Sequence, residues 1–494
     1  MAKGHDQRAQ IRKRMAAERG NDFAQGGSPV AMLYPSPYRA GMSSVGFQWI
    51  IKILREAGLQ VERAFTPDDP EAWRESKVPL HTYETERPVA HFPVIGVSLA
   101  YELELDGLIT ALELAGIPPL RRDRTHRHPR IVLGGPLTFS NPLPAAPFVD
   151  AMLMGEAEDV VVPAFEAALH TDGDAWLDEI AALDGGYVPA LHGERLPAVA
   201  KASDDMLPAF APILAPDAEL SDMFLIEGER GCHRSCSFCV MRRSTNGGMR
   251  LVSPERILSF VPEYAPRVGL VGAAISDHPQ LVGLLEQIVS SGRGVGISSL
   301  RADRVARKPD IARLLRAGGY KTLTVASDAA SERLRKVISK GTKEAHLIAC
   351  AKLAAEHKYK VMKVYMMVGV PDEQDSDIDE LVRFTSELAS IVPVSLGIAP
   401  FVPKRNTPLD IAGFAGIRPV EQRLKHLTRG LKGVAEVRPT SARWAWIEAE
   451  MVQGGWSAGE AVYEAMKSGG KFADYKRAFL AVDPLSRAPW RDVA

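Results

Sequence analysis

Three of the four cysteines in this chain lie close together, at Cys232, Cys236 and Cys239. They have a CxxxCxxC spacing on a segment that follows a predicted strand. In a chain whose charged start lacks the apolar stretch of a signal peptide, such clustering indicates metal binding rather than disulfides. Three thiolates on one short loop can hold three irons of a cubane cluster and leave the fourth iron open. A metal site that binds a substrate needs an open position of this kind.

A structural zinc site is the alternative, with His233 as the fourth ligand. Cys232 and His233 are adjacent and would ligate one ion awkwardly, and no second ligand pair lies nearby. The remaining cysteine, Cys350, shares a helical face with Leu347 and Ala354 in HLIACAKLAAEH, which predicts a buried core thiol. A second cluster built from thiolates alone is therefore excluded.

The aromatic Phe238 directly before the last cysteine makes the loop similar to the CxxxCxΦC motif of the radical S-adenosylmethionine (SAM) superfamily. The resemblance implies that the three cysteines hold a 4Fe–4S cluster whose open iron is chelated by SAM. An electron from the cluster would then cleave the sulfonium, and the 5′-deoxyadenosyl radical would abstract hydrogen from a substrate. It also implies an electron donor such as a flavodoxin or a ferredoxin.

The resemblance further implies SAM-binding residues after the predicted strands, where ligands of βα folds bind. The candidates are Phe238 in the cysteine loop, Ser276 and Asp277 in GLVGAAISDHP, Ser299 and Arg301 in SSLRAD, Asp328 and Arg333 in VASDAASERLR, and Gly369 in VYMMVGVPDE. A loop Asp or Arg is more often a helix cap or a surface ion pair. The order of these segments along the chain therefore carries more weight than any one of them.

These residues need a scaffold, and the pattern of residues 223–412 predicts one. Short apolar runs alternate there with amphipathic helical stretches, which is typical of βα units on a parallel sheet. Six such units are too few for a closed eight-stranded barrel, so we predict an open (β/α)6 partial TIM barrel. Residues 413–494 carry no chemical motif, and their pattern predicts a small helical C-terminal region.

The first half of the chain has a similar alternation over residues 28–200, which predicts a doubly wound, Rossmann-like domain. Residues 1–27 are highly charged and are predicted to be a flexible tail. Residues 201–222 are rich in Pro and Asp without a clear period, and are predicted to be a linker. The predicted fold class is therefore α/β, with a helical C-terminal end.

A doubly wound domain ahead of such a barrel resembles the cobalamin-binding subfamily of radical SAM enzymes. Phrases such as YPSPYRAGMSSVGFQ and GGPLTFSNPLPAAPFVDAMLMGEAED carry this similarity, which extends over roughly residues 30–410. The DxHxxG signature, whose histidine lies below cobalt, is absent here. The domain either binds cobalamin without that ligand or serves as a scaffold. The residues that the first interpretation assigns to cobalamin are Ser36, Gly41, Ser98, Tyr101, Gly134 and Gly135.

Three functions remain open. The first, which the resemblance favours, is a cobalamin-dependent radical methyltransferase. The second is a cobalamin-free radical enzyme that abstracts hydrogen before a rearrangement or an oxidation. The third is a non-enzymatic iron–sulfur or zinc protein. Methylthiotransferases are disfavoured because they resemble this chain in the barrel but carry three further cysteines near the N-terminus.

The composition of the chain excludes only a few classes of binding partner. Lys and Arg (60) balance Asp and Glu (61), so no net field favours nucleic acid or an acidic membrane. No run approaches the roughly 18 apolar residues of a membrane-spanning helix. We expect a cytoplasmic protein without a membrane partner. A small molecule or a peptide is a better expected substrate than RNA, because no RNA-binding module is recognisable.

Overall fold

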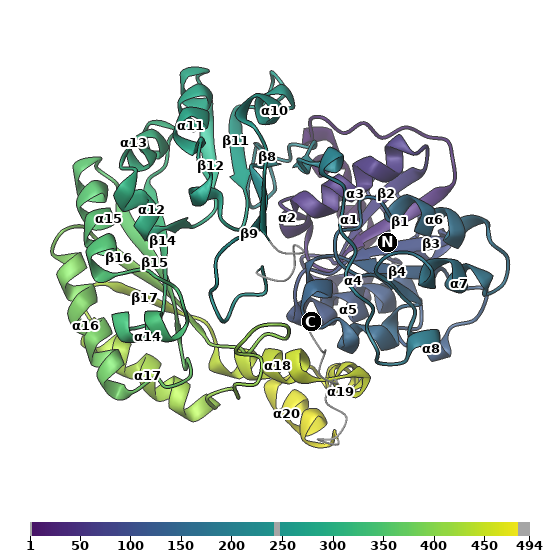
Figure 1. Ribbon diagram of the computed structural model, residues 1–494. Helices are drawn as coiled ribbons and strands as arrows, with labels where there is room; N and C mark the ends of the chain where they lie inside the picture. The colour runs from purple at the N-terminus through teal and green to yellow at the C-terminus, as the bar shows by residue number, and fades with distance from the viewer. Residues whose placement is uncertain (1, 242–247, 483–494) are drawn as a thin grey trace. The chain divides into compact units, whose positions relative to one another are not determined.

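The computed structural model describes residues 2–241 and 248–482, which form two compact α/β units (Figure 1). The first unit comprises residues 1–225 and 450–494, and the second comprises residues 226–449. Among the described residues, no helix is both long and apolar enough to cross a membrane. The predicted α/β fold class is confirmed.

The first unit is built on a six-stranded sheet in the order β2-β1-β3-β4-β5-β6. The strands are β1 (Pro29–Tyr34), β2 (Gln60–Phe65), β3 (Val94–Ser98), β4 (Arg130–Gly134), β5 (Ala151–Leu153) and β6 (Gly186–Tyr187). The first five are parallel, and β6 is antiparallel to β5. This order is that of a doubly wound fold, with its topological switch point between β1 and β3.

Helix α3 (Val45–Glu56) shows how an amphipathic segment with an N-cap forms a helix on this sheet. The side chain of Ser44 accepts a hydrogen bond from the Phe47 N–H, and Phe47, Ile51 and Leu54 are buried along one face. The other helices of this part are α1 (Ala2–Ala17), α2 (Tyr38–Gly41), α4 (Pro70–Ser76), α5 (Leu105–Ala115), α6 (Val161–His170), α7 (Ala175–Ala181) and α8 (Pro189–His192).

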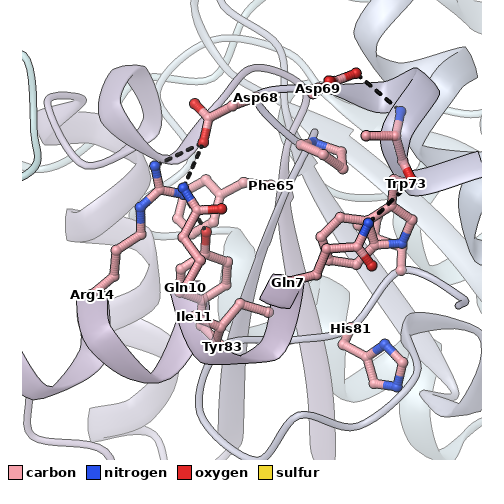
Figure 2. Close-up of a pocket in the computed structure, with 13 residues that line it drawn as sticks. Gln7, Gln10, Ile11, Arg14, Phe65, Asp68, Asp69, Trp73, His81 and Tyr83 are labelled. Carbon is pink, nitrogen blue, oxygen red and sulfur yellow. Dashed lines mark hydrogen bonds and ion pairs between the residues drawn. The ribbon is translucent and has the colours of Figure 1, made fainter. Parts of the chain in front are cut away.

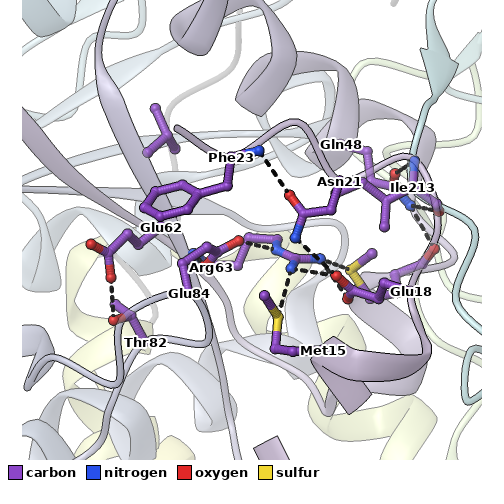
Figure 3. A network of polar contacts seen from close by, with 12 residues as sticks. Met15, Glu18, Asn21, Phe23, Gln48, Glu62, Arg63, Thr82, Glu84 and Ile213 are labelled. Atoms are coloured by element: carbon purple, nitrogen blue, oxygen red, sulfur yellow. Dashed lines mark hydrogen bonds and ion pairs between the residues drawn. The ribbon is translucent and has the colours of Figure 1, made fainter. Parts of the chain in front are cut away.

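The start of the chain is folded, which corrects the predicted flexible tail. Helix α1 places Ile11 in the core, and Glu18 follows it. Arg63 on β2 is fully buried; it donates to Glu18 Oε2 at 2.8 Å and to Glu84 Oε1 at 2.6 Å (Figure 3). A buried guanidinium requires charged partners. Glu18, which lies within the predicted tail, is therefore a core residue that neutralises Arg63.

The segment predicted as a linker is also packed into the first unit. Phe210 and Leu214 are buried, and Phe210 lies in the short strand β7 (Phe210–Ala211). The Ile213 N–H donates to Gln48 Oε1 at 2.9 Å, and Leu214 forms a β-bridge with Arg19. The Pro and Asp residues that suggested a linker therefore flank a short apolar segment that packs into the core.

The second unit begins within β8 (Met223–Glu227) and contains the partial barrel. Its further strands are β9 (Glu229–Cys232), β10 (Gly248–Leu251), β11 (Arg267–Val271), β12 (Gly294–Ile297), β13 (Leu300–Arg301), β14 (Thr322–Asp328), β15 (Val361–Val368), β16 (Val394–Pro400) and β17 (Glu436–Pro439). Its helices are α10 (Pro254–Ser259), α11 (Leu281–Ser290), α12 (Ala302–Arg307), α13 (Asp310–Ala317), α14 (Glu332–Val337), α15 (Glu344–Glu356), α16 (Asp375–Ala389) and α17 (Ile417–Gly430).

The six predicted βα strands correspond to β8, β11, β12, β14, β15 and β16. Helices α15, α16 and α17 pack on one side of strands β15 to β17 (Figure 1). The prediction of a helical region from residue 413 misses β17, which pairs in parallel with β16 and extends the sheet by one strand. Its sequence, EVRP, has one apolar side chain besides Pro, because a strand at the edge of a sheet can expose its side chains.

The predicted helical C-terminal region is present, and its last part, from residue 450, belongs to the first unit. Helix α18 (Ala442–Gln453) leads to α19 (Trp456–Lys467) and α20 (Phe472–Leu480). The Tyr475 hydroxyl on α20 donates to Asp106 on α5 at 2.5 Å, and Asn141 donates to the carbonyl of Val452 at 2.8 Å. These contacts join segments that are more than 300 residues apart in the sequence.

Candidate iron–sulfur and SAM site

The cysteine loop leaves the barrel at β9, whose last residue is Cys232. Strand β9 pairs with β10 in an antiparallel ladder, with Cys232 opposite Gly248. Farther along the loop, Ser237 N–H donates to the Ile338 carbonyl, and the Ser237 carbonyl accepts from Leu409 N–H, both at 3.1 Å. The loop is thus held by the barrel on both sides of Cys236, which is only 8% exposed.

The three loop cysteines are free thiols. Burial raises the pKa of Cys232 and Cys239, and the neighbouring thiol of Cys236 raises both further. Metal binding would therefore release protons from this loop. In the described part of the chain, no three His, Cys, Asp or Glu side chains surround a position for a single metal ion. The fit to a cluster rests on donor chemistry, because three thiols on one loop are the ligands that iron–sulfur clusters use.

Asp277, predicted as a SAM-binding residue, holds the cysteine loop. Its carboxylate is fully buried and accepts two hydrogen bonds from Arg234 of the loop, at 2.8 and 2.7 Å, and one from Arg304 of α12. Burial acts to raise the pKa of Asp277, but the bonds from the two guanidiniums outweigh it and lower that pKa. Both carboxylate oxygens are therefore engaged by the chain itself.

Two other candidates after β11 and β12 are brought together. The Ser276 Oγ accepts from the Arg301 N–H at 3.2 Å, and the Arg301 side chain donates to Asp303 at 3.0 Å and to the Lys340 carbonyl at 3.2 Å. Ser299, between them in the sequence, is exposed. The half-buried Phe238 stays within the cysteine loop.

The candidates after β14 and β15 separate into two groups. Asp328 has a left-handed backbone (φ +65°) at a bulge in β14 and forms an ion pair with Lys340, whose carbonyl accepts from Arg301. Arg333 instead forms an ion pair with Asp377 of α16. Its partner therefore lies on a helix rather than at the strand ends.

Gly369 directly follows β15 and has φ +79°, which favours glycine. Its N–H donates to Glu373 Oε1 at 2.8 Å, and a Cβ there would lie 3.1 Å from Ala415. Glycine at this position therefore allows a turn that packs against the chain's own loop.

Sequence reasoning missed Glu229, which lies on β9 three residues before Cys232. Its side chain is buried; Oε1 accepts from the Ala274 N–H at 2.6 Å, and the buried Oε2 has no hydrogen-bond partner among the described residues. A Cβ on Gly272 would lie 2.3 Å from Oε1, so a larger residue there would displace the Glu229 carboxyl group. Burial raises the pKa of Glu229 to about 7. The only signal in the sequence was a carboxylate on a strand leading to the cysteines.

In the first unit, Glu104 spans the switch point between β1 and β3. Its carboxylate accepts from Ser36 Oγ at 3.0 Å and from the Ala100 N–H at 2.7 Å. Burial raises the pKa of Glu104. A Cβ on Gly107 of α5 would lie 1.9 Å from the Pro35 carbonyl oxygen, so the helix lies directly against the end of β1. Glu104 therefore joins Ser36, after β1, to Ala100, after β3, at the edge of the sheet where doubly wound folds bind nucleotides.

Two of the glycines assigned to cobalamin also allow close packing within the fold. A Cβ on Gly41 would lie 2.4 Å from the Phe65 ring, and one on Gly135 would lie 2.7 Å from the Leu99 carbonyl. Ser98, Tyr101 and Gly134 lie at or after the ends of β3 and β4. Ser36, another of these residues, already donates its hydroxyl to Glu104 at the switch point.

A cavity of about 200 Å³ lies in the first unit where α1 covers the end of β2 (Figure 2). Gln7, Arg14, Trp73 and His81 are among the residues that line it. Within the part of the chain that the structure describes, the buried Gln7 Oε1 and Trp73 Nε1 have no hydrogen-bond partners. Water or a small polar ligand could satisfy both atoms.

Family models match both units. Residues 46–189 match "Radical SAM proteins, N-terminal", and residues 226–385 match the "Radical SAM superfamily". An uncharacterized protein of Methanocaldococcus jannaschii is 26% identical over 419 residues, which are 82% of this chain and 83% of that protein.

Solved structures share the fold at low identity. The radical SAM methyltransferase TsrM of Kitasatospora setae superposes with a TM-score of 0.54 and 15% identity, covering 80% of this chain and 76% of TsrM. The cobalamin-dependent SAM radical enzyme OxsB superposes with a TM-score of 0.50 and 11% identity, covering 92% of this chain and 72% of OxsB. These likenesses show the fold alone.

Proposed function

We propose that this chain, which belongs to the radical SAM superfamily, cleaves SAM reductively with a 4Fe–4S cluster on Cys232, Cys236 and Cys239. The observation that carries the proposal is the anchored loop with three free thiols at the start of the barrel. The cluster, when bound, would supply the electron that breaks the sulfonium bond of SAM.

The chain's own residues hold this loop in place. Asp277 neutralises Arg234 within the loop, and the Ser237 backbone bonds to the barrel on either side. Ser276, which directly precedes Asp277, is linked to Arg301 by a hydrogen bond. We propose that this group, with Asp328, binds SAM, because polar side chains there follow the strands at which βα folds place their ligands.

The reaction that follows SAM cleavage has two candidates. Cobalamin-dependent methyl transfer is supported by the shared fold with TsrM, a methyltransferase, and OxsB, a cobalamin-dependent enzyme. The Glu104 bridge across the switch point favours the other candidate, hydrogen abstraction without cobalamin, followed by rearrangement or oxidation. We propose the second as the better fit to this structure.

The test is anaerobic reconstitution with iron and sulfide, followed by addition of SAM and a chemical reductant. Formation of 5′-deoxyadenosine by the wild-type chain, and its loss in Cys236→Ala, would support SAM cleavage. A reconstituted protein that holds iron but forms none would overturn it. In parallel, incubation with hydroxocobalamin and desalting tests the reaction class: retention near one per chain would favour methyl transfer, and no retention would favour the cobalamin-free reaction.

A further inference from the structure

Strands β14 to β17 have two different faces. In β15, Met362, Val364 and Met366 are buried, and they alternate with Lys363 and Tyr365, which are not. Successive side chains of a strand point to opposite faces, so the buried set faces the helices that pack on this sheet. Tyr365 is 40% exposed on the other face, which is called here the inner face.

The register places further polar residues on the same inner face. Lys363 pairs across the sheet with Ser395, which pairs with Glu436, while Tyr365 pairs with Gly397. Gly397 in turn pairs with Arg438 of β17. Because these strands are parallel and in register, one row contains Lys363 and Glu436, and the next row contains Tyr365 and Arg438.

Contacts on this face leave positive charge available. The Lys363 Nζ contacts the Tyr365 hydroxyl at 2.9 Å and lies 4.5 Å from the centre of its ring. Arg438 uses Nε to pair with Glu436 Oε1 at 2.8 Å, and both side chains are more than half exposed. Among the described residues, Lys363 forms no ion pair, so two cations share this face with one nearby carboxylate.

Tyr365 is able to lie across the sheet because its neighbour is glycine. A Cβ on Gly397 would lie 2.8 Å from the Tyr365 ring, closer than side chains allow. The ring therefore rests over the backbone of β16. Closed barrels of this type fill their interior with bulky apolar side chains. Here the corresponding positions present an ammonium, a phenol and a guanidinium instead.

We propose that Lys363, Tyr365 and Arg438 bind an anionic group, a carboxylate or a phosphate, of the substrate. The inference rests on the proposed function, because it takes the inner face of the barrel as the place where the substrate lies. An ammonium and a guanidinium donate charge-assisted hydrogen bonds to such oxyanions, and the phenol adds a neutral donor. Glu436 would hold Arg438 in position.

The test uses the full-length chain and two minimal probes, inorganic phosphate and acetate, each followed by the line broadening of its own nuclear magnetic resonance signal. We expect the wild type to broaden at least one signal. The Lys363→Met/Arg438→Gln double variant should reduce that excess broadening about threefold or more, because it removes both cations. Lys363→Arg/Arg438→Lys should retain it.

A matched control is Lys352→Met/Arg429→Gln, which removes one lysine and one arginine from exposed helix positions in the same unit. Broadening of the phosphate signal alone would indicate a phosphate-bearing substrate. Broadening of the acetate signal alone would indicate a substrate with a carboxylate. Equal broadening in the wild type and the Met/Gln double variant, or none in either, would overturn the proposal. The measurement needs neither SAM nor a cluster, so its failure is distinct from a failure to form 5′-deoxyadenosine.

Discussion

The guanidinium of Arg234 and the carboxylate of Asp277 are joined by two hydrogen bonds, at 2.8 and 2.7 Å. Arg234 lies between the first two cysteines of the loop, whereas Asp277 follows β11. The same carboxylate also binds Arg304 of α12. One buried acid therefore connects the cysteine loop to two other segments of the barrel.

Asp277→Asn should weaken this connection. The two arginines are about a quarter exposed, so water compensates part of the loss, and we expect destabilisation of about 1–3 kcal/mol. We also expect fewer irons per chain after reconstitution. Urea unfolding and iron analysis measure the two effects. Asp310→Asn, which breaks a half-exposed pair with Arg313, is the control and should change stability by less than about 1 kcal/mol. Equal effects of both variants would contradict the role of Asp277.

The assignment of cluster ligands makes the four cysteines unequal. Alanine at Cys232, Cys236 or Cys239 should abolish the broad iron–sulfur absorption of the reconstituted protein. Cys350→Ala should retain it, because that thiol is fully buried between helices and burial raises its pKa to about 12. Visible spectra and iron counts of the four variants measure whether each still binds the cluster. A loop variant that keeps full absorption would be inconsistent with the assignment.

Glu229 should make stability depend on pH. Its folded pKa of about 7 exceeds the usual value of 4.5, so folding favours the protonated carboxyl. The stability that the protonated Glu229 contributes to the fold is fully present below about pH 4.5. It is lost as the pH rises toward about 7 and stays lost above that. Glu229→Gln cannot ionise and should remove this loss. The check is the free energy of unfolding of both proteins at about pH 5 and about pH 8, which bracket most of the range.

Other groups titrate in that range, including Asp106, whose pKa burial raises to about 6. The informative quantity is therefore the difference between the wild type and Glu229→Gln, which retains Asp106. A difference that does not change with pH would show that Glu229 does not titrate there.

Glu18 should matter far more than its place near the N-terminus suggests. Glu18→Gln leaves the fully buried Arg63 with Glu84 alone, and removing one partner of a buried ion pair costs about 3–5 kcal/mol. Glu56→Gln, which removes a 60% exposed carboxylate from its pair with Lys52, should cost less than about 1 kcal/mol. Thermal unfolding of the two variants makes the comparison. If the start of the chain were a flexible tail, both would unfold like the wild type.

The sequence alone was sufficient for the repeating architecture and for the cysteine loop. The six βα strands of the barrel and the sheet of the first unit are visible because apolar runs and amphipathic helices repeat locally. The cysteine loop could be recognised because its three thiols lie on one short segment. Cys350 was predicted as a core thiol from helical spacing, and it is fully buried.

The tertiary structure decided which charged residues belong to the interior. Glu18, Asp277 and Glu229 resemble surface carboxylates in the sequence, and only their distant neighbours show otherwise. Glu18 meets Arg63 from 45 residues away, and Asp277 meets Arg234 from 43 residues away. The inner face of the barrel likewise depends on the register between β15, β16 and β17. Local patterns predict elements, because propensity and periodicity act over a few residues. Pairing between charges depends on which elements meet, and that is set by the packing of the whole fold.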